Sequence, residues 1–284
     1  MQEMVLGIGG HGLRLVGGRS LEMVMKVPGM REFVSSDAQV DMTVRLDTPF
    51  DRPSCALLYR YLTLEDTVEC HFGISASGVY YCQFGHLSTL RFNLRRPHEV
   101  ILTPLRSIEA VRMVLWMAYS LLGMEYNALP VHSSAVICEG RAVLCLGESG
   151  TGKSTHTRLW REHIPGTTLL NDDSPIVAIE NGEAVVYGSP WSGKIDCFRP
   201  ERYPLAALIR IEQKPFNRIT PLPPLQALAA LQPSCPPALS HDDYCLDRTM
   251  QFIGSVVSSV PTYRLGCLPD REAALLSHST IFNS

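Results

Sequence analysis

The stretch 147–155 constrains the fold of this chain more than any other and reads Gly-Glu-Ser-Gly-Thr-Gly-Lys-Ser-Thr. It matches the pattern G-x-x-x-x-G-K-[ST], whose fixed positions are Gly147, Gly152, Lys153 and Ser154. The apolar run 142–146 before it predicts a buried strand, and residues 154–161 predict the start of a helix. Strand, glycine-rich loop and helix in this order are the context that a phosphate-binding loop requires.

The residue types of this loop suit the binding of a nucleotide. Glycines let the backbone curl so that successive N–H groups point inward at phosphate oxygens. Lys153 is expected to reach the β- and γ-phosphates, and the Ser154 hydroxyl to bind Mg²⁺. The positive end of the following helix attracts the same anion. The sequence therefore predicts an ATP site made by the whole loop: Gly147, Glu148, Ser149, Gly150, Thr151, Gly152, Lys153, Ser154 and Thr155.

The composition is that of an ordinary globular protein. The chain has 284 residues, of which 45% are hydrophobic and 19% charged, and its formal net charge is −3. This balance gives no electrostatic reason to expect nucleic acid or an acidic membrane surface as a partner. The sequence has no apolar run long enough for a membrane span, no signal peptide and no C-x-x-C spacing among its nine cysteines. We therefore expect a cytoplasmic protein with reduced thiols.

The hydrophobic pattern divides the chain into three parts. Residues 1–104 contain segments of alternating apolar and polar side chains, such as 40–46, and predict a β-rich N-terminal domain. Residues 105–127 predict a connecting helix, because apolar residues recur at helical spacing and Ser107 can cap its start. Residues 128–284, which contain the phosphate-binding loop, predict a second domain of alternating strands and helices. The expected fold class is thus α/β, with a mixed sheet and flanking helices around the loop.

Two adjacent carboxylates follow the next apolar strand signal. Residues 169–173 read Leu-Leu-Asn-Asp-Asp, so Asp172 and Asp173 lie at a strand end. Mg²⁺ prefers oxygen ligands, and a second carboxylate nearby can accept the proton of an attacking hydroxyl. Because neighbouring residues of an extended segment point to opposite sides, the two carboxylates need not share one role. An Asp-Asp turn that caps the next element is the structural alternative.

His132 lies at the start of the strand signal 131–138, about fifteen residues before the loop. A lone histidine in such a place is more often a hydrogen-bonded core residue than a catalyst. The order of a histidine-bearing strand, a glycine loop and an Asp-Asp strand nevertheless makes His132 a candidate.

This order resembles the HPr kinase/phosphorylase family and its relatives, which share a fold with ATP-dependent phosphoenolpyruvate carboxykinase. The resemblance covers residues 131–194 and, more loosely, 200–284. It implies a P-loop core of the HPr kinase/carboxykinase type. It further implies that Asp172 deprotonates an acceptor serine hydroxyl, that His132 lies near the phosphates, and that Ser154 and an acidic residue hold Mg²⁺.

One segment departs from the family. The HPr-directed enzymes carry Glu-Ile-Arg-Gly after the Asp-Asp strand, whereas this chain has Val-Val-Tyr-Gly at 185–188, without the metal-binding Glu and the Arg. Asp173 is then expected to replace that metal ligand, and Lys194 to supply positive charge at the transferring phosphoryl group. An exposed Gly-Lys turn is the alternative for Lys194. The Pro-Trp-Ser-Gly-Lys turn at 190–194 resembles the HPr-kinase-related proteins found near peptide-modification genes, a serine kinase branch.

Together these features predict an ATP- and Mg²⁺-dependent phosphotransferase that acts on a hydroxyl, with a serine of a small protein or peptide, or free serine, as acceptor. In this hypothesis Lys153 holds the phosphates, and Ser154 and Asp173 hold Mg²⁺, with Asp172 as a further candidate ligand. Asp172 accepts the proton, while His132 and Lys194 stabilise charge.

Two other functions stay open: a carboxykinase-type enzyme of small metabolites, and a non-catalytic ATP-binding sensor. The role of the N-terminal domain is open as well. It either recognises the acceptor or forms a dimerisation surface, so a homo-oligomer is one of two expectations.

Overall fold

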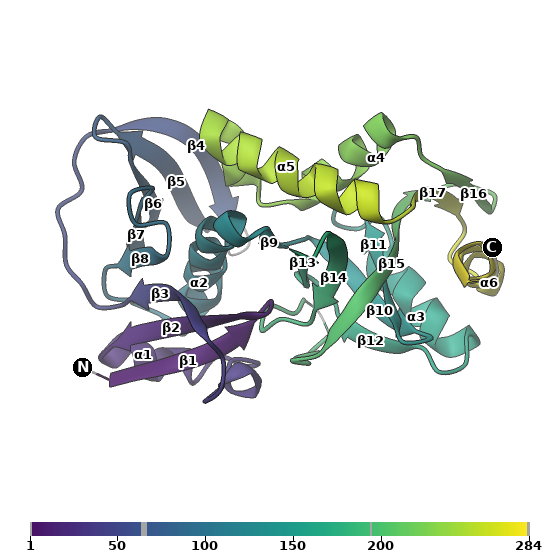
Figure 1. Ribbon diagram of the computed structural model, residues 1–284, viewed down its shortest axis with the longest axis horizontal. Coiled ribbons are helices and arrows are strands. Elements are labelled where there is room, and N and C mark those ends of the chain that lie inside the picture. The colour runs from purple at the N-terminus through teal and green to yellow at the C-terminus, as the bar shows by residue number, and fades with distance from the viewer. Residues whose placement is uncertain (1, 64–66, 194, 283–284) are drawn as a thin grey trace. The chain divides into compact units, whose positions relative to one another are not determined.

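The computed structural model describes residues 2–63, 67–193 and 195–282 and shows a mixed α/β chain (Figure 1). Its contacts divide the chain into two compact units. Unit 1 comprises Met1–Tyr126 and Ala238–Leu246, and unit 2 comprises Asn127–Pro237 and Asp247–Ser284.

Unit 1 is built on an eight-stranded sheet of order β1-β2-β3-β8-β7-β6-β5-β4. Its strands are β1 Gln2–Ile8, β2 His11–Gly17, β3 Val40–Arg45, β4 Cys55–Thr63, β5 Val68–Ser75, β6 Val79–Phe84, β7 Ser88–Asn93 and β8 Glu99–Leu102. The β2–β3 and β3–β8 pairs are parallel and the others antiparallel. The helical segments are α1 Arg19–Val24, η1 Arg31–Phe33, α2 Ile108–Gly123 and η2 Met124–Tyr126. The β-rich character expected for this region is thus present.

Helix α2 lies within the range 105–127 for which a connecting helix is expected, and its residues belong to unit 1. Its predicted cap is confirmed, because the Ala110 N–H donates to the Ser107 hydroxyl at 3.2 Å. The helix contacts strands β7 and β8, and Val114, Leu115 and Leu121 are fully buried. A helix buried on so wide a face is part of a core.

The segment Ala238–Leu246 departs from the expected boundary, since it was assigned to the second domain but packs in unit 1. The Tyr80 hydroxyl donates to Asp242 at 2.6 Å, and the ring of His241 stacks on Tyr59 with centroids 4.1 Å apart. These contacts between residues far apart in the chain leave no local signal in the sequence.

Unit 2 is built on a nine-stranded mixed sheet. Strands β12-β10-β11-β15-β14-β13-β9 follow one another, β17 pairs with β15, and β16 pairs with β17. The β11–β15 and β15–β17 pairs are parallel. The strands are β9 Ala128–Pro130, β10 Ser133–Cys138, β11 Arg141–Leu146, β12 Thr168–Asn171, β13 Ile176–Glu180, β14 Glu183–Tyr187, β15 Arg202–Gln213, β16 Arg218–Pro221 and β17 Thr262–Cys267. The helical segments are α3 Lys153–His163, α4 Pro224–Leu231, η3 Gln232–Ser234, η4 Pro237–His241, α5 Asp243–Ser259 and α6 Arg271–Phe282. Residues 238–241 of η4 and 243–246 of α5 belong to unit 1.

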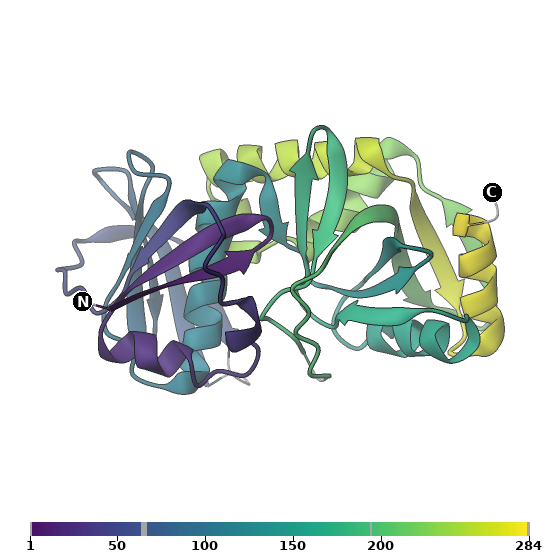
Figure 2. The ribbon, with the colours of Figure 1, turned by 60° about the horizontal axis from the view of Figure 1, so that its bottom comes forward.

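Helices α3 and α6 lie side by side and share one core with strands β10, β11, β15 and β17 (Figures 1 and 2). Fully buried Trp160 lies at its centre. Its indole N–H donates to His156 Nε2 at 3.1 Å and to the Ser277 hydroxyl at 2.9 Å, so α3 and α6 are joined by polar as well as apolar contacts. Helix α3 is thereby held firmly, and its first residue is Lys153.

Buried His156 makes the stability of the protein depend on pH. Burial lowers the pKa of His156 to about 4, whereas an exposed histidine titrates near 6.5. The stabilisation from the neutral ring is complete above about pH 6.5 and is lost as the pH falls towards 4, because the unfolded chain binds the proton more tightly. We expect the free energy of unfolding to fall by roughly 3 kcal/mol over this interval. Urea titrations at several pH values measure the slope, which His156→Gln should flatten. An equal slope in both proteins would contradict the assignment.

None of the helices in the described parts of the chain combines the length and the apolar character needed to cross a bilayer.

Candidate functional site

The predicted strand, loop and helix are present as β11, residues 147–152 and α3. Three glycines of the loop have positive φ angles: Gly147 at 152°, Gly150 at 82° and Gly152 at 104°. A Cβ at Gly147 would lie 2.4 Å from the Thr151 hydroxyl oxygen, whereas Gly150 and Gly152 face open space. The loop thus requires glycine at position 147 because a side chain would not fit, and at positions 150 and 152 because the backbone has a positive φ angle. The result is a curled loop at the N-terminal end of a fixed helix.

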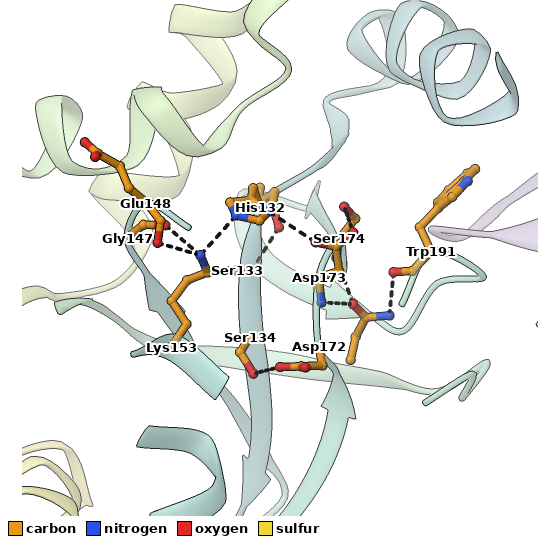
Figure 3. Close-up of polar contacts among 12 residues, drawn as sticks. His132, Ser133, Ser134, Gly147, Glu148, Lys153, Asp172, Asp173, Ser174 and Trp191 are labelled. Atoms are coloured by element: carbon orange, nitrogen blue, oxygen red, sulfur yellow. Dashed lines mark hydrogen bonds and ion pairs between the residues drawn. The ribbon is translucent and has the colours of Figure 1, made fainter. Parts of the chain in front are cut away.

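Lys153 is buried, and its ammonium group points back along the loop (Figure 3). Nζ donates to the carbonyl oxygens of Gly147 at 2.8 Å and Glu148 at 3.1 Å, and it lies 3.0 Å from His132 Nε2. These partners use all three N–H groups. Burial lowers the pKa of Lys153, an effect that the nearby carboxylates of Asp173 and Asp172 oppose.

His132 links the lysine to the Asp-Asp segment. Its Nδ1 lies 3.3 Å from Asp173 Oδ1. Because a charged lysine only donates, Nε2 accepts from Lys153 and the proton of a neutral ring lies on Nδ1, facing Asp173. The strand predicted over 131–138 is interrupted here, since the His132 N–H donates to the Ser234 carbonyl at 2.7 Å instead of joining the sheet. This break lets the imidazole reach the loop.

Asp172 and Asp173 point in different directions, as expected for neighbours. Asp173 is partly exposed and faces His132, whereas Asp172 is 5% exposed. Asp172 Oδ1 accepts from the Ser134 hydroxyl at 2.7 Å, but its Oδ2 is buried with no hydrogen-bond partner among the described residues. A buried carboxylate oxygen without a partner is costly for stability. It is the strongest sign that this site serves a ligand and not only the fold.

Asn171, fully buried, shapes the Asp-Asp turn and was not singled out from the sequence. Its Oδ1 accepts from the backbone N–H groups of Asp173 at 3.0 Å and Ser174 at 2.9 Å. Its Nδ2 donates to the carbonyl oxygens of Ser189 at 3.3 Å and Trp191 at 3.2 Å. One side chain thus holds the turn and the following 189–191 segment together. In the sequence, an asparagine directly before two aspartates could have indicated a turn held by its side chain.

We expect Asn171→Ala to lower the free energy of unfolding by about 2–3 kcal/mol, because buried backbone groups would lose their partner. Urea unfolding measures the change. Gln251→Ala removes an exposed amide on α5 of the same unit and should change stability by less than about 0.5 kcal/mol. Equal effects of the two substitutions would show that Asn171 does not hold the turn.

Arg210 is a second cation beside the loop that the sequence analysis missed. It lies on β15 opposite Leu146, the residue before the loop. Its side chain is 20% exposed, with Nη2 3.8 Å from a Glu148 carboxylate oxygen. The Nη1 atom is buried without a hydrogen-bond partner among the described residues. In the sequence, a charged residue within the apolar run 205–211 could have indicated that Arg210 has a functional role.

A pocket of about 410 Å³ adjoins the loop. Thr151, Gly152 and Thr155 form its loop side. Apolar residues form much of the remainder: Leu159, Ile211, Pro215, Leu268 and Pro269. Its size and mixed lining suit a small organic ligand.

The structure brings His132, Lys153 and Asp173 together, with Asp172 in the adjoining turn. Ser154 lies half-buried in the first turn of α3. The Ser154 carbonyl accepts from the Thr157 hydroxyl at 3.2 Å. The same Thr157 hydroxyl lies 2.8 Å from the hydroxyl of Ser134, the residue that contacts Asp172. Glu148 points outward, with an 80% exposed side chain. Ser149 is exposed in the loop. Lys194, the remaining predicted residue, lies outside the described residues.

The residues present fit Mg²⁺ and a nucleotide phosphate. Within the described residues Asp172 Oδ2 lacks a hydrogen-bond partner, and hydroxyl and carboxylate oxygens are the ligands that Mg²⁺ prefers. The glycines leave open space beside the loop backbone, and Lys153 supplies positive charge. These are the donor types that a metal–nucleotide complex requires.

No protein-family model matches this chain, and no curated protein does. Among solved structures, the Hpr(Ser) kinase/phosphatase from Coxiella burnetii is similar, with 15% sequence identity and a TM-score of 0.33. The match covers 54% of this chain and 88% of that chain.

Proposed function

We propose that this protein is an ATP- and Mg²⁺-dependent phosphotransferase that transfers a phosphoryl group to a hydroxyl. The observation that carries the proposal is the buried Oδ2 of Asp172, which has no hydrogen-bond partner among the described residues and lies beside the Lys153–His132–Asp173 chain of contacts. A base, a phosphate-binding cation and candidate metal ligands within one constellation are the parts that phosphoryl transfer needs.

In the proposed site the loop backbone and Lys153 hold the phosphates, and the adjoining pocket receives the nucleoside. Ser154 and Asp173 would hold Mg²⁺, with Asp172 as a further candidate, and the ion supplies neutralisation of phosphate charge. Lys153 exchanges its bonds to the Gly147 and Glu148 carbonyls for phosphate oxygens. His132 keeps Lys153 and Asp173 in place through its two ring nitrogens.

Asp172 is the proposed general base, and Oδ2 is the atom that takes the proton of the acceptor hydroxyl. Ser134 holds the other oxygen at 2.7 Å and so fixes the carboxylate. The burial of Asp172 keeps bulk water from competing for the proton. Arg210, 3.8 Å from the Glu148 carboxylate, adds positive charge beside the loop. Because such catalysis depends on positioning and electrostatics, fixed side chains of this kind are what it requires.

The resemblance of residues 131–194 to HPr kinases makes serine the first acceptor to test, in a small protein, a peptide or as the free amino acid. The experiment is transfer from γ-labelled ATP with Mg²⁺ into three pools: a serine-peptide mixture, small metabolites and a host-cell extract. We expect a labelled acceptor in one pool. If ATP binds but no label appears in any pool and ATP stays intact, the protein is a sensor and the proposal fails. Label in the metabolite pool alone, on a compound other than serine, would favour the carboxykinase-type alternative.

A further inference from the structure

A separate cluster of metal-ligating side chains lies at the end of the β10–β11 hairpin that is remote from the glycine-rich loop. Cys138 ends β10, Glu139 follows it in the turn, and His278 lies on α6. The Cys138 Sγ, a Glu139 carboxylate oxygen and a His278 ring nitrogen all lie within 4.8 Å of one another. None of these residues takes part in the proposed phosphotransfer, so the inference does not rest on it.

We propose that Cys138, Glu139 and His278 bind a transition-metal dication, with Zn²⁺ as the expected ion. Thiolate, imidazole and carboxylate are the donors that zinc prefers over magnesium or calcium. His278 Nε2 already lies 3.5 Å from Glu139 Oε1. In a tetrahedral zinc site, bonds of about 2.0–2.3 Å place the ligand atoms about 3.3–3.6 Å apart. The histidine–glutamate pair therefore has the required spacing, and Cys138 has to approach by at most about 1 Å.

A buried polar atom of the cluster points to a ligand as well. His278 Nε2 is buried without a hydrogen-bond partner among the residues described. Such a group is costly unless something satisfies it. A metal would bind Nε2 directly. The Thr167 hydroxyl, which is 8% exposed and hydrogen-bonds the Cys138 thiol, would hold the sulfur ligand in place.

The imidazole is already oriented for this role. His278 stacks on Phe282 with ring centroids 5.2 Å apart, and its ring meets Trp160 edge-on at 5.6 Å. A ligand fixed by packing loses little entropy when it binds. The Arg141 guanidinium lies over the Phe282 ring, 4.7 Å from the ring centroid. Zn²⁺ with one thiolate and one carboxylate is electrically neutral, and the thiol proton of Cys138 is released to solvent.

The metal would act as a cross-link between the β10–β11 hairpin and helix α6. Both elements belong to the core that also holds α3. A ligand that binds only the folded state raises stability with its free concentration. We therefore expect the melting temperature of metal-free protein to rise as Zn²⁺ is added.

The test is titration of the chelator-treated full-length protein with Co²⁺, which substitutes for zinc and absorbs light. We expect one equivalent to produce a thiolate-to-cobalt charge-transfer band that Zn²⁺ then removes. The band requires a cysteine ligand, so cobalt held only by carboxylates at Asp172 and Asp173 would not produce it. Cys138→Ser and His278→Gln should abolish the band, and Cys55→Ser, a half-buried thiol of unit 1, should retain it.

Glu139→Gln keeps the test decisive if a buried variant fails to fold, because Glu139 lies exposed in a turn. We expect at least tenfold weaker Co²⁺ affinity in this variant and no rise in its melting temperature at Zn²⁺ concentrations that stabilise the wild type. Absence of the band in wild-type protein, or an undiminished band in Cys138→Ser, would overturn the proposal. Unchanged affinity in Glu139→Gln would do the same.

Discussion

Asp172→Asn is expected to lower the rate of phosphoryl transfer by about 10²–10⁴-fold, the usual contribution of a positioned general base. Asparagine keeps the oxygen that accepts from Ser134 but cannot take a proton at the other position. ATP binding should change little, because Lys153 and the loop remain. The measurement is transfer of label to the acceptor under saturating ATP, alongside the dissociation constant for ATP.

The same variant should be at least as stable as the wild type. Asp172 Oδ2 is buried without a hydrogen-bond partner in the described part of the chain, and replacing a buried charge by a neutral amide removes part of that cost. Loss of activity without loss of stability is typical of a residue kept for function. Asp247→Asn, on the exposed face of α5, is the control and should alter neither quantity. Transfer within twofold of the wild type in Asp172→Asn would remove Asp172 from the role of base.

Lys153→Met is expected to weaken ATP binding and to lower the transfer rate by at least about 10²–10³-fold, since it removes a fixed positive charge from the phosphate site. The loss should appear in both the dissociation constant and kcat, because the lysine contacts phosphate before and during transfer. Calorimetry with a non-hydrolysable ATP analogue and the labelled-transfer assay measure the two effects.

Lys153→Arg should not restore activity. The lysine is 9% exposed, and its three N–H groups fit three acceptors at 2.8–3.1 Å, a space into which a planar guanidinium does not fit. Lys26→Met, an exposed lysine of unit 1, tests for a general effect of lysine loss and should leave binding unchanged. Full ATP binding by Lys153→Met would rule out a phosphate role for this lysine.

The local parts of the fold could be predicted from the sequence. The strand, loop and helix around Gly147–Ser154 follow from residue types that are neighbours in the chain, and so does the Ser107 cap. Strand β3 was predicted because apolar and polar side chains alternate over 40–46. The β1–β2 hairpin was missed, although the adjacent Gly9 and Gly10 at its turn both have positive φ angles. Its glycine-rich strands give only a weak alternating pattern.

The parts of the site that depend on long-range contacts could not be predicted. His132 was singled out, but the backbone break that turns its ring towards Lys153 needs the carbonyl of Ser234, about a hundred residues later. Ser134 and Arg210 were missed for the same reason, since Ser134 meets Asp172 only when β10 pairs with β12, and Arg210 meets the loop only when β15 pairs with β11. The predicted helix over 105–127 was nearly right in extent, whereas its role as a connector stays a prediction, because periodicity shows which face is buried but not against what.

Unit 1 is completed by residues that the ribosome makes late. Its sheet is encoded within the first 126 positions, but Asp242 and His241, which contact Tyr80 and Tyr59, come after all of residues 127–237. Domains generally fold as units while the chain emerges from the ribosome. Unit 1 therefore cannot complete its fold, and the Tyr80 hydroxyl stays without Asp242, until residues 238–246 have been synthesised. A fragment ending at residue 126 would remain in that incomplete state. Expression of the N-terminal half alone therefore should not yield the native unit, whereas a chain cut after residue 246 contains every residue of it.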